Sequence, residues 1–414
     1  MRKTTLSTSR LPSVLLALLA TLGLFAGCAS SPAAGTAPGF RTLPRPEPAA
    51  TAVAPAPAPD VAALPPEAAI PLTPELRSGE LANGLRYFVR RNTEPAGRAE
   101  LRLVVDAGSI LEEEDQRGLA HFLEHMLFNG TERFPGQDLV VFLEGTGMQV
   151  GPEVNAYTTF DETVYQLKIP TDRQGILPTA LDVLEDWSAA ALLEPEEIDA
   201  ERGVITEEWR LRDLSAGGRI REKTLPLYLT GSRYLERLPI GTPEVIQGAP
   251  PERIERFYRT WYRPDNLSVI AVGDFDPARV EAMIRERFSD LKNPDEPEPR
   301  RRYDVPGHPE TLYEVVTDPE QPVTVVRLGW KRPAPEEGTI GSYKEYLEAQ
   351  LFDQMLNLRL FEASQQEGSA LLQASAGRDL LVRPLELFGI SALAPEGRSP
   401  EALEAILTEV ERVR

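Results

Sequence analysis

The chain has 414 residues, of which 42% are hydrophobic and 7% aromatic, so it can bury one complete core and part of a second. Its formal net charge of −20 disfavours nucleic acid and anionic lipid and leaves neutral or cationic partners such as peptides, although a well-solvated acidic surface accounts for the same charge. The single cysteine excludes an internal disulfide framework and a cysteine-rich zinc module. Any metal site must therefore use histidine and carboxylate ligands.

The first 27 residues have the pattern of a signal peptide. Basic side chains within residues 1–10 precede an apolar segment at 13–25, and Ala26-Gly27 supplies the small residues that a signal peptidase requires. The only cysteine, Cys28, follows in a context that resembles the lipobox of bacterial lipoproteins. We therefore predict its lipidation, with ordinary cleavage near residues 26–29 as the alternative. Residues 28–70, rich in proline and alanine, are predicted to form a lipid-anchored linker.

Strand-like and helix-like patterns alternate from residue 75 onward. Asn83-Gly84 favours a turn before a strand, and Pro195 suits the first turn of a helix. The patterns predict strands at 85–89, 101–105, 154–157, 163–169 and 267–272, and helices at 118–128, after 136, and at 195–212, 251–261 and 275–290.

A charged, proline-rich stretch at 292–302 is typical of a linker between domains. Beyond it, we expect strands at 312–316 and 323–329 and helices at 342–363 and 400–414. Neither half has regular β-α-β spacing, which favours an α+β fold with helices packed on a layered, antiparallel-rich sheet. We assign 71–295 to a first domain and 296–414 to a second, which partly repeats the element order of the first.

The predicted helix at 118–128 carries two of the three histidines in the chain. On a helical wheel His121, Glu124 and His125 lie at about 0°, 300° and 40°, so the three side chains share one face. The other residues are apolar on nearly every side, which predicts a buried helix. Buried ionisable groups need partners, and a divalent cation could hold both imidazoles beside the carboxylate. The alternative is that both histidines bond to backbone groups while Glu124 pairs with an arginine.

A third ligand is expected from the helix at 195–212. Its apolar stripe, which includes Ile198 and Ile205, also contains Glu201 and Glu208, about two turns apart, whereas Glu207 lies on the opposite side. Carboxylates within an apolar stripe are costly unless they are paired or coordinated. We interpret Glu208 as the metal ligand and Glu201 as an acid that positions water or a ligand.

The residues at 118–131 resemble the active-site helix of the pitrilysin and insulinase family, which has an H-x-x-E-H motif. The segment 201–208 is similar to the family's downstream helix, and its distance from His125 is similar to that in the bacterial branch related to pyrroloquinoline-quinone-associated peptidases. The resemblance implies one zinc ion per catalytic domain and two homologous domains of the processing-peptidase-like metallohydrolase type. It also implies that Asn155, Ala156 and Tyr157 form an edge strand that captures the substrate backbone.

The resemblance further implies a zinc-dependent endopeptidase that hydrolyses peptides or unfolded polypeptides in the bacterial cell envelope, facing the periplasm. Zinc would activate a water molecule, with Glu124 as the general base. Because the second domain is expected to be incomplete, a second peptidase-family half is expected in a longer chain or in a partner subunit, and it would supply the carbonyl-stabilising arginine and tyrosine. Membrane contact would be through the lipid anchor only, without nucleic acid. The alternative is a non-catalytic, peptide-binding or scaffold subunit.

Overall fold

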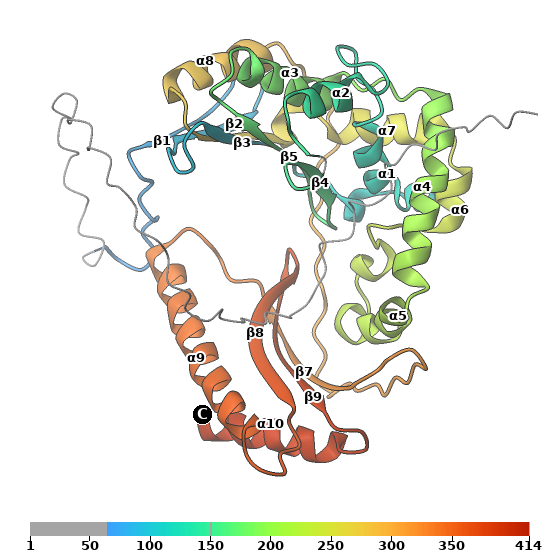
Figure 1. Ribbon diagram of the computed structural model, residues 1–414, viewed down its shortest axis with the longest axis vertical. Helices are drawn as coiled ribbons and strands as arrows, with labels where there is room; N and C mark the ends of the chain where they lie inside the picture. Colours follow the sequence, from blue (N-terminus) through green and yellow to red (C-terminus); the bar gives the residue numbers. More distant parts are fainter. Residues whose placement is uncertain (1–63, 150, 414) are drawn as a thin grey trace, which may run out of the picture. The chain divides into compact units, whose positions relative to one another are not determined.

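The computed structural model describes residues 64–149 and 151–413 (Figure 1). The predicted signal peptide, Cys28 and the linker up to residue 63 lie outside the described residues. Within the described part, no helix is long and apolar enough to cross a membrane. The end of the predicted linker is not a free tether, because Ala68 and Ile70 form backbone hydrogen bonds with Ile340 and Gly338.

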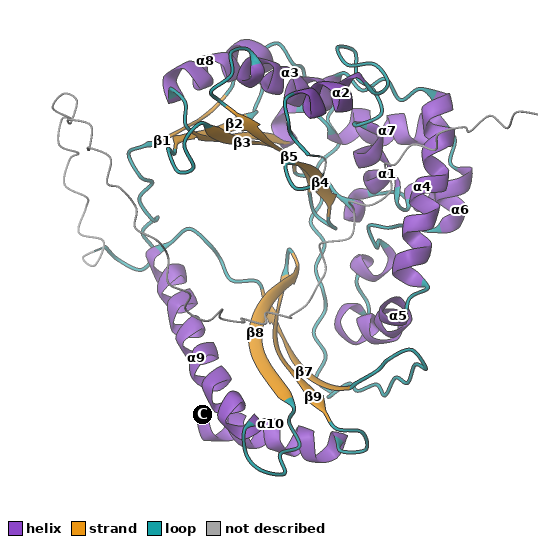
Figure 2. Ribbon diagram, viewed as in Figure 1, coloured by secondary structure: helices purple, strands orange, loops and turns teal. Residues whose placement is uncertain are grey.

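The first of two sheets has six strands in the order β1-β2-β6-β3-β5-β4 (Figure 2). Only β2 and β6 run parallel, and all other neighbouring strands run antiparallel. β4 forms one edge of this sheet. The strands are β1 (Leu76–Glu80), β2 (Arg86–Arg91), β3 (Arg98–Val105), β4 (Val154–Thr158), β5 (Thr163–Pro170) and β6 (Leu267–Gly273).

One face of the six-stranded sheet carries the main hydrophobic core. Side chains on this face, such as Tyr87, Leu101 and Val269, are at most 1% exposed. The helices α3 (Ile176–Ala189) and α8 (Pro277–Phe288) contact β2, β3 and β5 and cover this face (Figure 1). Side chains on the other face alternate with the buried ones and are partly or fully exposed. This alternation is the period-2 pattern of a sheet that is covered on one side.

The first domain contains further helices besides α3 and α8, and among them α1 is the one whose residues are all buried. Helix α1 packs against β4 and β5 on one side and against α4, α6 and α7 on the others, which explains why every one of its residues is buried. These helices are α1 (Leu119–Met126), α2 (Asp138–Gly145), α4 (Pro195–Asp213), α5 (Ala216–Leu229), α6 (Pro243–Gly248) and α7 (Pro251–Trp261). Short 3-10 helices lie at Ser109–Leu111, Glu114–Gln116, Arg233–Glu236 and Pro264–Asn266.

The second sheet has three antiparallel strands in the order β7-β9-β8. Its elements are β7 (Thr324–Pro333), α9 (Ile340–Ser364), β8 (Gln373–Val382), β9 (Leu385–Ala394) and α10 (Ser399–Val413). The order strand, helix, two strands, helix repeats that of β3, α1, β4, β5 and α3, apart from the additional helix α2 between α1 and β4. The strand order β7-β9-β8 matches β3-β5-β4. The α+β fold and the repeated domain architecture predicted from the sequence are thus confirmed.

One sequence expectation for the second domain differs from the structure, and several elements of both domains were not predicted. The strand expected at 312–316 is wrong: these residues have no regular structure, and Tyr313 and Val315 are 83% and 80% exposed. Their alternating apolar pattern finds no neighbouring strand to pair with. The elements that were not predicted are β8 and β9 in the second domain and β1, α3, α5 and α6 in the first. Glycine and alanine within the segments of β8 and β9 weaken the period-2 pattern on which a strand prediction depends.

Candidate metal centre

Helix α1 is held in place at its N-terminus. Gly118, the residue before the helix, has φ +98, and an added Cβ would lie 2.8 Å from the Cα of Gly241, so only glycine fits there. The buried carboxylate of Glu112 accepts hydrogen bonds from the backbone N–H groups of Gly118 (2.9 Å) and Ala120 (2.8 Å). These contacts satisfy donors that a helix N-terminus otherwise leaves unpaired, and they fix where the side chains of α1 point.

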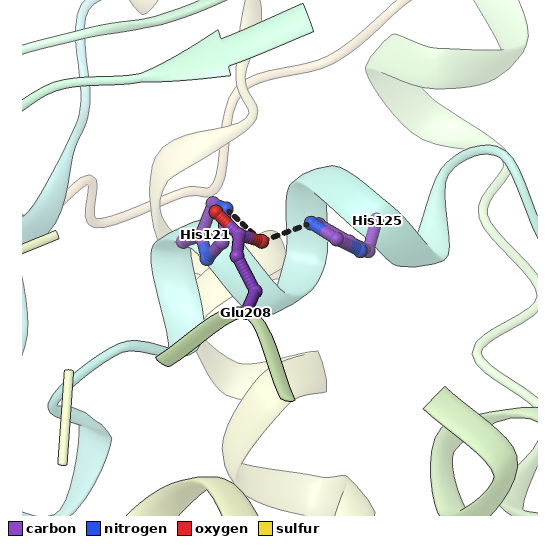
Figure 3. A group of neighbouring side chains, drawn as sticks. All are labelled: His121, His125 and Glu208. Atoms are coloured by element: carbon purple, nitrogen blue, oxygen red, sulfur yellow. Dashed lines mark ion pairs between the residues drawn. The ribbon is translucent and has the colours of Figure 1, made fainter. Parts of the chain in front are cut away.

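The structure brings together the three side chains that the sequence identified as ligands. Figure 3 shows His121 and His125 on α1, with Glu208 of α4 facing both. The Oε2 atom of Glu208 lies 3.6 Å from Nε2 of His121 and 3.5 Å from Nε2 of His125. One ligand atom from each residue lies within 4.8 Å of the other two. Among the described residues, no other group of at least three His, Cys, Asp or Glu side chains could hold a metal ion.

These residues fit a zinc ion. Donor atoms about 2.0–2.2 Å from one tetrahedral ion lie about 3.3–3.6 Å apart, which matches both separations to Glu208. Nε2 of His125 and Oε2 of Glu208 are buried and have no hydrogen-bond partner, a costly arrangement unless a cation binds between them. The alternative of backbone-bonded histidines is not supported at this nitrogen, because Nε2 of His125 makes no such bond.

Glu201 lies behind His125 on the side away from Glu208. Its Oε1 atom is 2.8 Å from Nδ1 of His125, and its Oε2 atom accepts a 2.8 Å hydrogen bond from the side-chain amide of Asn129. A proton on Nδ1 of His125 would donate to Glu201 and leave the lone pair of Nε2 free for a metal. The sequence identified Glu201 but not Asn129, because the contact joins positions 72 residues apart and has no local pattern.

The choice between the two adjacent glutamates on α4 is clear in the structure. Glu208 faces the histidines, and its Oε1 atom is 3.3 Å from a guanidinium nitrogen of Arg212. Glu207 is exposed and pairs with Arg210 one turn along the helix. The helical-wheel argument therefore selects the carboxylate that lies at the site. Arg212 was not singled out from the sequence, although its spacing of four residues from Glu208 is the usual one for an ion pair on a helix.

Glu124 is the remaining ionisable residue of α1 at this site. It is 4% exposed, and burial raises the pKa of its carboxyl to about 7, although the charge of His125 and a hydrogen bond from Thr158 lower it. The hydroxyl of Thr158 donates to Oε2 of Glu124 over 2.5 Å. A carboxylate with a pKa near neutrality is suited to take and return a proton. The sequence did not point to Thr158, which lies at the end of β4.

The acidic groups around His125 favour a positive charge at the site. Burial lowers the pKa of His121 to about 3, and His125 adds to that shift, so His121 is neutral. Burial also opposes the charged form of His125, but the hydrogen bond to Glu201 and the nearby carboxylates of Glu208 and Glu124 outweigh it and raise the pKa to about 10. Burial likewise opposes ionisation of Glu208, whereas the histidines and Arg212 lower its pKa to about 2. A proton or a metal cation between His125 and Glu208 meets this demand for positive charge.

The predicted substrate-binding residues lie on the edge strand beside α1. β4 is the last strand of the six-stranded sheet and contacts α1. The backbone N–H of Ala156 donates to the side-chain oxygen of its neighbour Asn155 rather than to β5. In an antiparallel strand the N–H and C=O of one residue point to the same side, so both groups of Ala156 face the open edge. Asn155 and Tyr157 are partly exposed.

Both domains of the chain are similar to known proteins. Residues 87–223 match the family described as Insulinase (Peptidase family M16), and residues 249–414 match the Peptidase M16 inactive domain. The structure of the first half of the periplasmic protease PqqL from Escherichia coli superimposes with a TM-score of 0.77 and 33% identity, covering 83% of this chain and 73% of that one. The chain belongs to the insulinase family of peptidases. The family predicted from the sequence is thereby confirmed.

Similar proteins of this family include PqqL-like zinc proteases, which confirms the predicted branch. The Zinc protease PQQL-like of Arabidopsis thaliana is 39% identical over 314 residues, covering 76% of this chain and 33% of the relative. The Probable zinc protease PqqL of Escherichia coli (strain K12) is 33% identical over 344 residues, covering 83% of this chain and 37% of the relative. The chain thus spans about a third of the length of these relatives.

Proposed function

We propose that this insulinase-family chain is the catalytic part of a zinc-dependent endopeptidase that hydrolyses peptides or unfolded polypeptides. The observation that carries the proposal is the convergence of His121, His125 and Glu208 beside the buried carboxylate of Glu124. A structural zinc site does not need a base next to it, whereas a hydrolytic site does. The names of the similar zinc proteases support the same activity.

His121, His125 and Glu208 would hold one zinc ion in this domain. When bound, the ion would polarise the peptide carbonyl and make a water molecule more acidic. Glu124 would accept a proton from that water and deliver it to the leaving amine, since its pKa near 7 allows both transfers. Thr158 holds the carboxylate of Glu124 in one orientation, and Glu201 holds the ring of His125.

The substrate backbone would pair with β4. The free N–H and C=O groups of Ala156 would form hydrogen bonds with an extended peptide, and Asn155 would release the N–H that it now accepts. Because β4 contacts α1, a peptide bound in this way would pass the metal-binding side chains. Backbone pairing recognises an extended chain rather than a sequence, which is why we propose unfolded polypeptides as substrates.

The site is proposed to act in the bacterial cell envelope, on the periplasmic side, with the chain anchored through a lipid on Cys28. The similar PqqL of Escherichia coli is named as a periplasmic protease, which supports the location. The catalytic domain is proposed to span 71–295 and the non-catalytic one 296–414. A second peptidase-family half, in the same polypeptide or in a partner subunit, would complete the assembly, since the matched part of this chain covers only 33% and 37% of these relatives.

The test is the Glu124→Gln variant, which keeps the shape of the side chain but cannot accept a proton. We expect unchanged zinc content and a loss of at least about 100-fold in peptide hydrolysis, the contribution typical of a general base. Glu132→Gln is a matched control at an exposed glutamate outside the site. Peptidase activity that survives Glu124→Gln would rule out the assigned base. A wild-type chain that binds peptides and zinc but never cleaves them would instead favour the scaffold subunit.

A further inference from the structure

The face of the six-stranded sheet opposite α3 and α8 is called here the open face. One row of side chains on this face can be followed from strand to strand by the register. Phe88 of β2 is opposite Ile270 of β6, Ile270 is opposite Arg102 of β3, Arg102 is opposite Gln166 of β5, and Gln166 is opposite Asn155 of β4. All five side chains are partly exposed. The open face is thus continuous with the strand edge proposed to bind substrate.

The open face carries an excess of unpaired positive charge. Arg86 and Arg90 lie on either side of Phe88 along β2, and Lys168 lies on β5. All three are exposed and make no ion pair with the described residues. The acids of this face compensate little. Glu100 is already paired with Arg102, and Glu153, beside Lys168, is paired with Arg98. Glu80, opposite Arg86, makes no ion pair with the described residues.

The local charge contrasts with the charge of the chain as a whole. The formal net charge is −20, yet three free cations face one free carboxylate here. Salt screens the interaction between exposed charges beyond about 8–10 Å. A ligand on the open face would therefore interact more strongly with the local cations than with the distant acids. The partly exposed Phe88 and Ile270 among these cations suit a ligand that combines carboxylates with apolar side chains.

We propose that the open face binds acidic segments of polypeptide substrates that flank the bond to be cleaved. This rests on the proposed peptidase function and adds the substrate class. Strands are about 4.8 Å apart, so Lys168 lies one strand from β4 and Arg86 and Arg90 lie four strands, about 19 Å, away. An extended chain covers that distance in about six residues. A substrate must therefore extend roughly six residues beyond β4 to reach the arginines. For shorter peptides, KM should not change when the arginines are replaced.

The test compares two long peptides that are identical around the cleaved bond and differ in a distal segment, which contains Glu in one and Gln in the other. The triple variant Arg86→Gln/Arg90→Gln/Lys168→Gln should raise KM for the acidic peptide about tenfold without changing kcat, as expected for a few solvent-exposed charge pairs. Its KM for the Gln peptide should not change. Added salt should reduce the preference of the wild type for the acidic peptide over the Gln peptide.

Controls separate charge from folding. Arg279 is exposed on α8, on the covered side of the same sheet, and the Arg279→Gln variant should behave as wild type. The variant Arg86→Lys/Arg90→Lys keeps the charge and should keep the preference. If Arg279→Gln raises KM for the acidic peptide as much as the triple variant does, the effect comes from the overall charge of the protein. The proposal is then overturned.

Failure of this inference is distinguishable from failure of the proposed function. Fluorescence anisotropy of both peptides on the full chain carrying Glu124→Gln measures binding without turnover. Weaker binding of the acidic peptide by the triple variant supports the inference even if no cleavage is ever seen. Equal binding by both proteins overturns it while the peptidase function stands. A single-stranded oligonucleotide that binds as tightly as the acidic peptide also overturns it, because the face would then recognise polyanions in general.

Discussion

At the scale of single residues, the site combines two histidines and two glutamates with polar side chains that orient them. The spacing of His121, Glu124 and His125 places three side chains on one face of any helix, so the prediction needed no tertiary information. Glu208 was separable from Glu207 by the same argument. Thr158 and Asn129 were not predictable, because each acts through a hydrogen bond to a residue distant in the chain. A local sequence pattern cannot predict such a contact.

The hydrogen bond from Thr158 to Glu124 gives a prediction at this scale. Thr158→Val keeps the side-chain shape but removes the hydroxyl that orients the carboxylate. We expect kcat for a peptide to fall about tenfold while KM and zinc content stay unchanged. Thr158→Ser, which retains the hydroxyl, should recover most of the activity. If valine and serine variants lose activity equally, the threonine acts through packing and not through its hydroxyl.

At the scale of elements, α1 shows what a pattern can and cannot predict. The helix and its burial follow from the apolar residues around the histidines, and the structure confirms both. The start of the helix depends on contacts that have no local pattern. Glu112 caps it from six residues away, and Gly118 is in contact with Gly241 of a distant loop. These contacts set the rotation of α1, and with it the direction of the ligand side chains.

Two glycines that precede helices allow a matched test of this contact. Gly118 and Gly175 have similar positive φ values, +98 and +92, but only Gly118 has backbone within reach of an added Cβ. Gly175→Ala should cost about 1 kcal/mol for the left-handed conformation alone. Gly118→Ala should cost roughly 1–3 kcal/mol more, because the backbone at Gly241 must move. Urea unfolding measures the free energy of unfolding of both variants. If the two variants are destabilised equally, the close approach to Gly241 does not contribute to the cost of Gly118→Ala.

At the scale of the whole molecule, the described residues form two cores joined by a specific contact. One core includes the six-stranded sheet, and the other includes α9, α10 and the second sheet. Val382 and Leu385, at the turn between β8 and β9, belong to the first core. Between them, the backbone N–H of Arg383 donates to Asp161, and its guanidinium binds Asp106. Asp161 lies in the loop that follows Thr158, so this turn supports the loop beside the site.

The Arg383 contacts predict a measurable coupling. Arg383→Met should destabilise the chain by about 1.5–3 kcal/mol, the range for hydrogen bonds to charged groups, and should speed hydrogen exchange in residues 159–162. Arg332 is a control, since its pair with Glu386 is 3.9 Å long and its side chain is 57% exposed. Arg332→Met should change stability by less than about 0.5 kcal/mol. Unchanged exchange at 159–162 in Arg383→Met would argue against a supporting role for the turn.

The central claim is that His121, His125 and Glu208 together hold zinc. The direct measurement is the zinc content per chain after dialysis, by elemental analysis, in the wild type and in the variants His121→Ala, Glu208→Ala and Glu207→Ala. We expect about one zinc ion per chain in the wild type and in Glu207→Ala, and almost none in His121→Ala and Glu208→Ala. Wild-type zinc content in Glu208→Ala, or its loss from Glu207→Ala, would contradict the account.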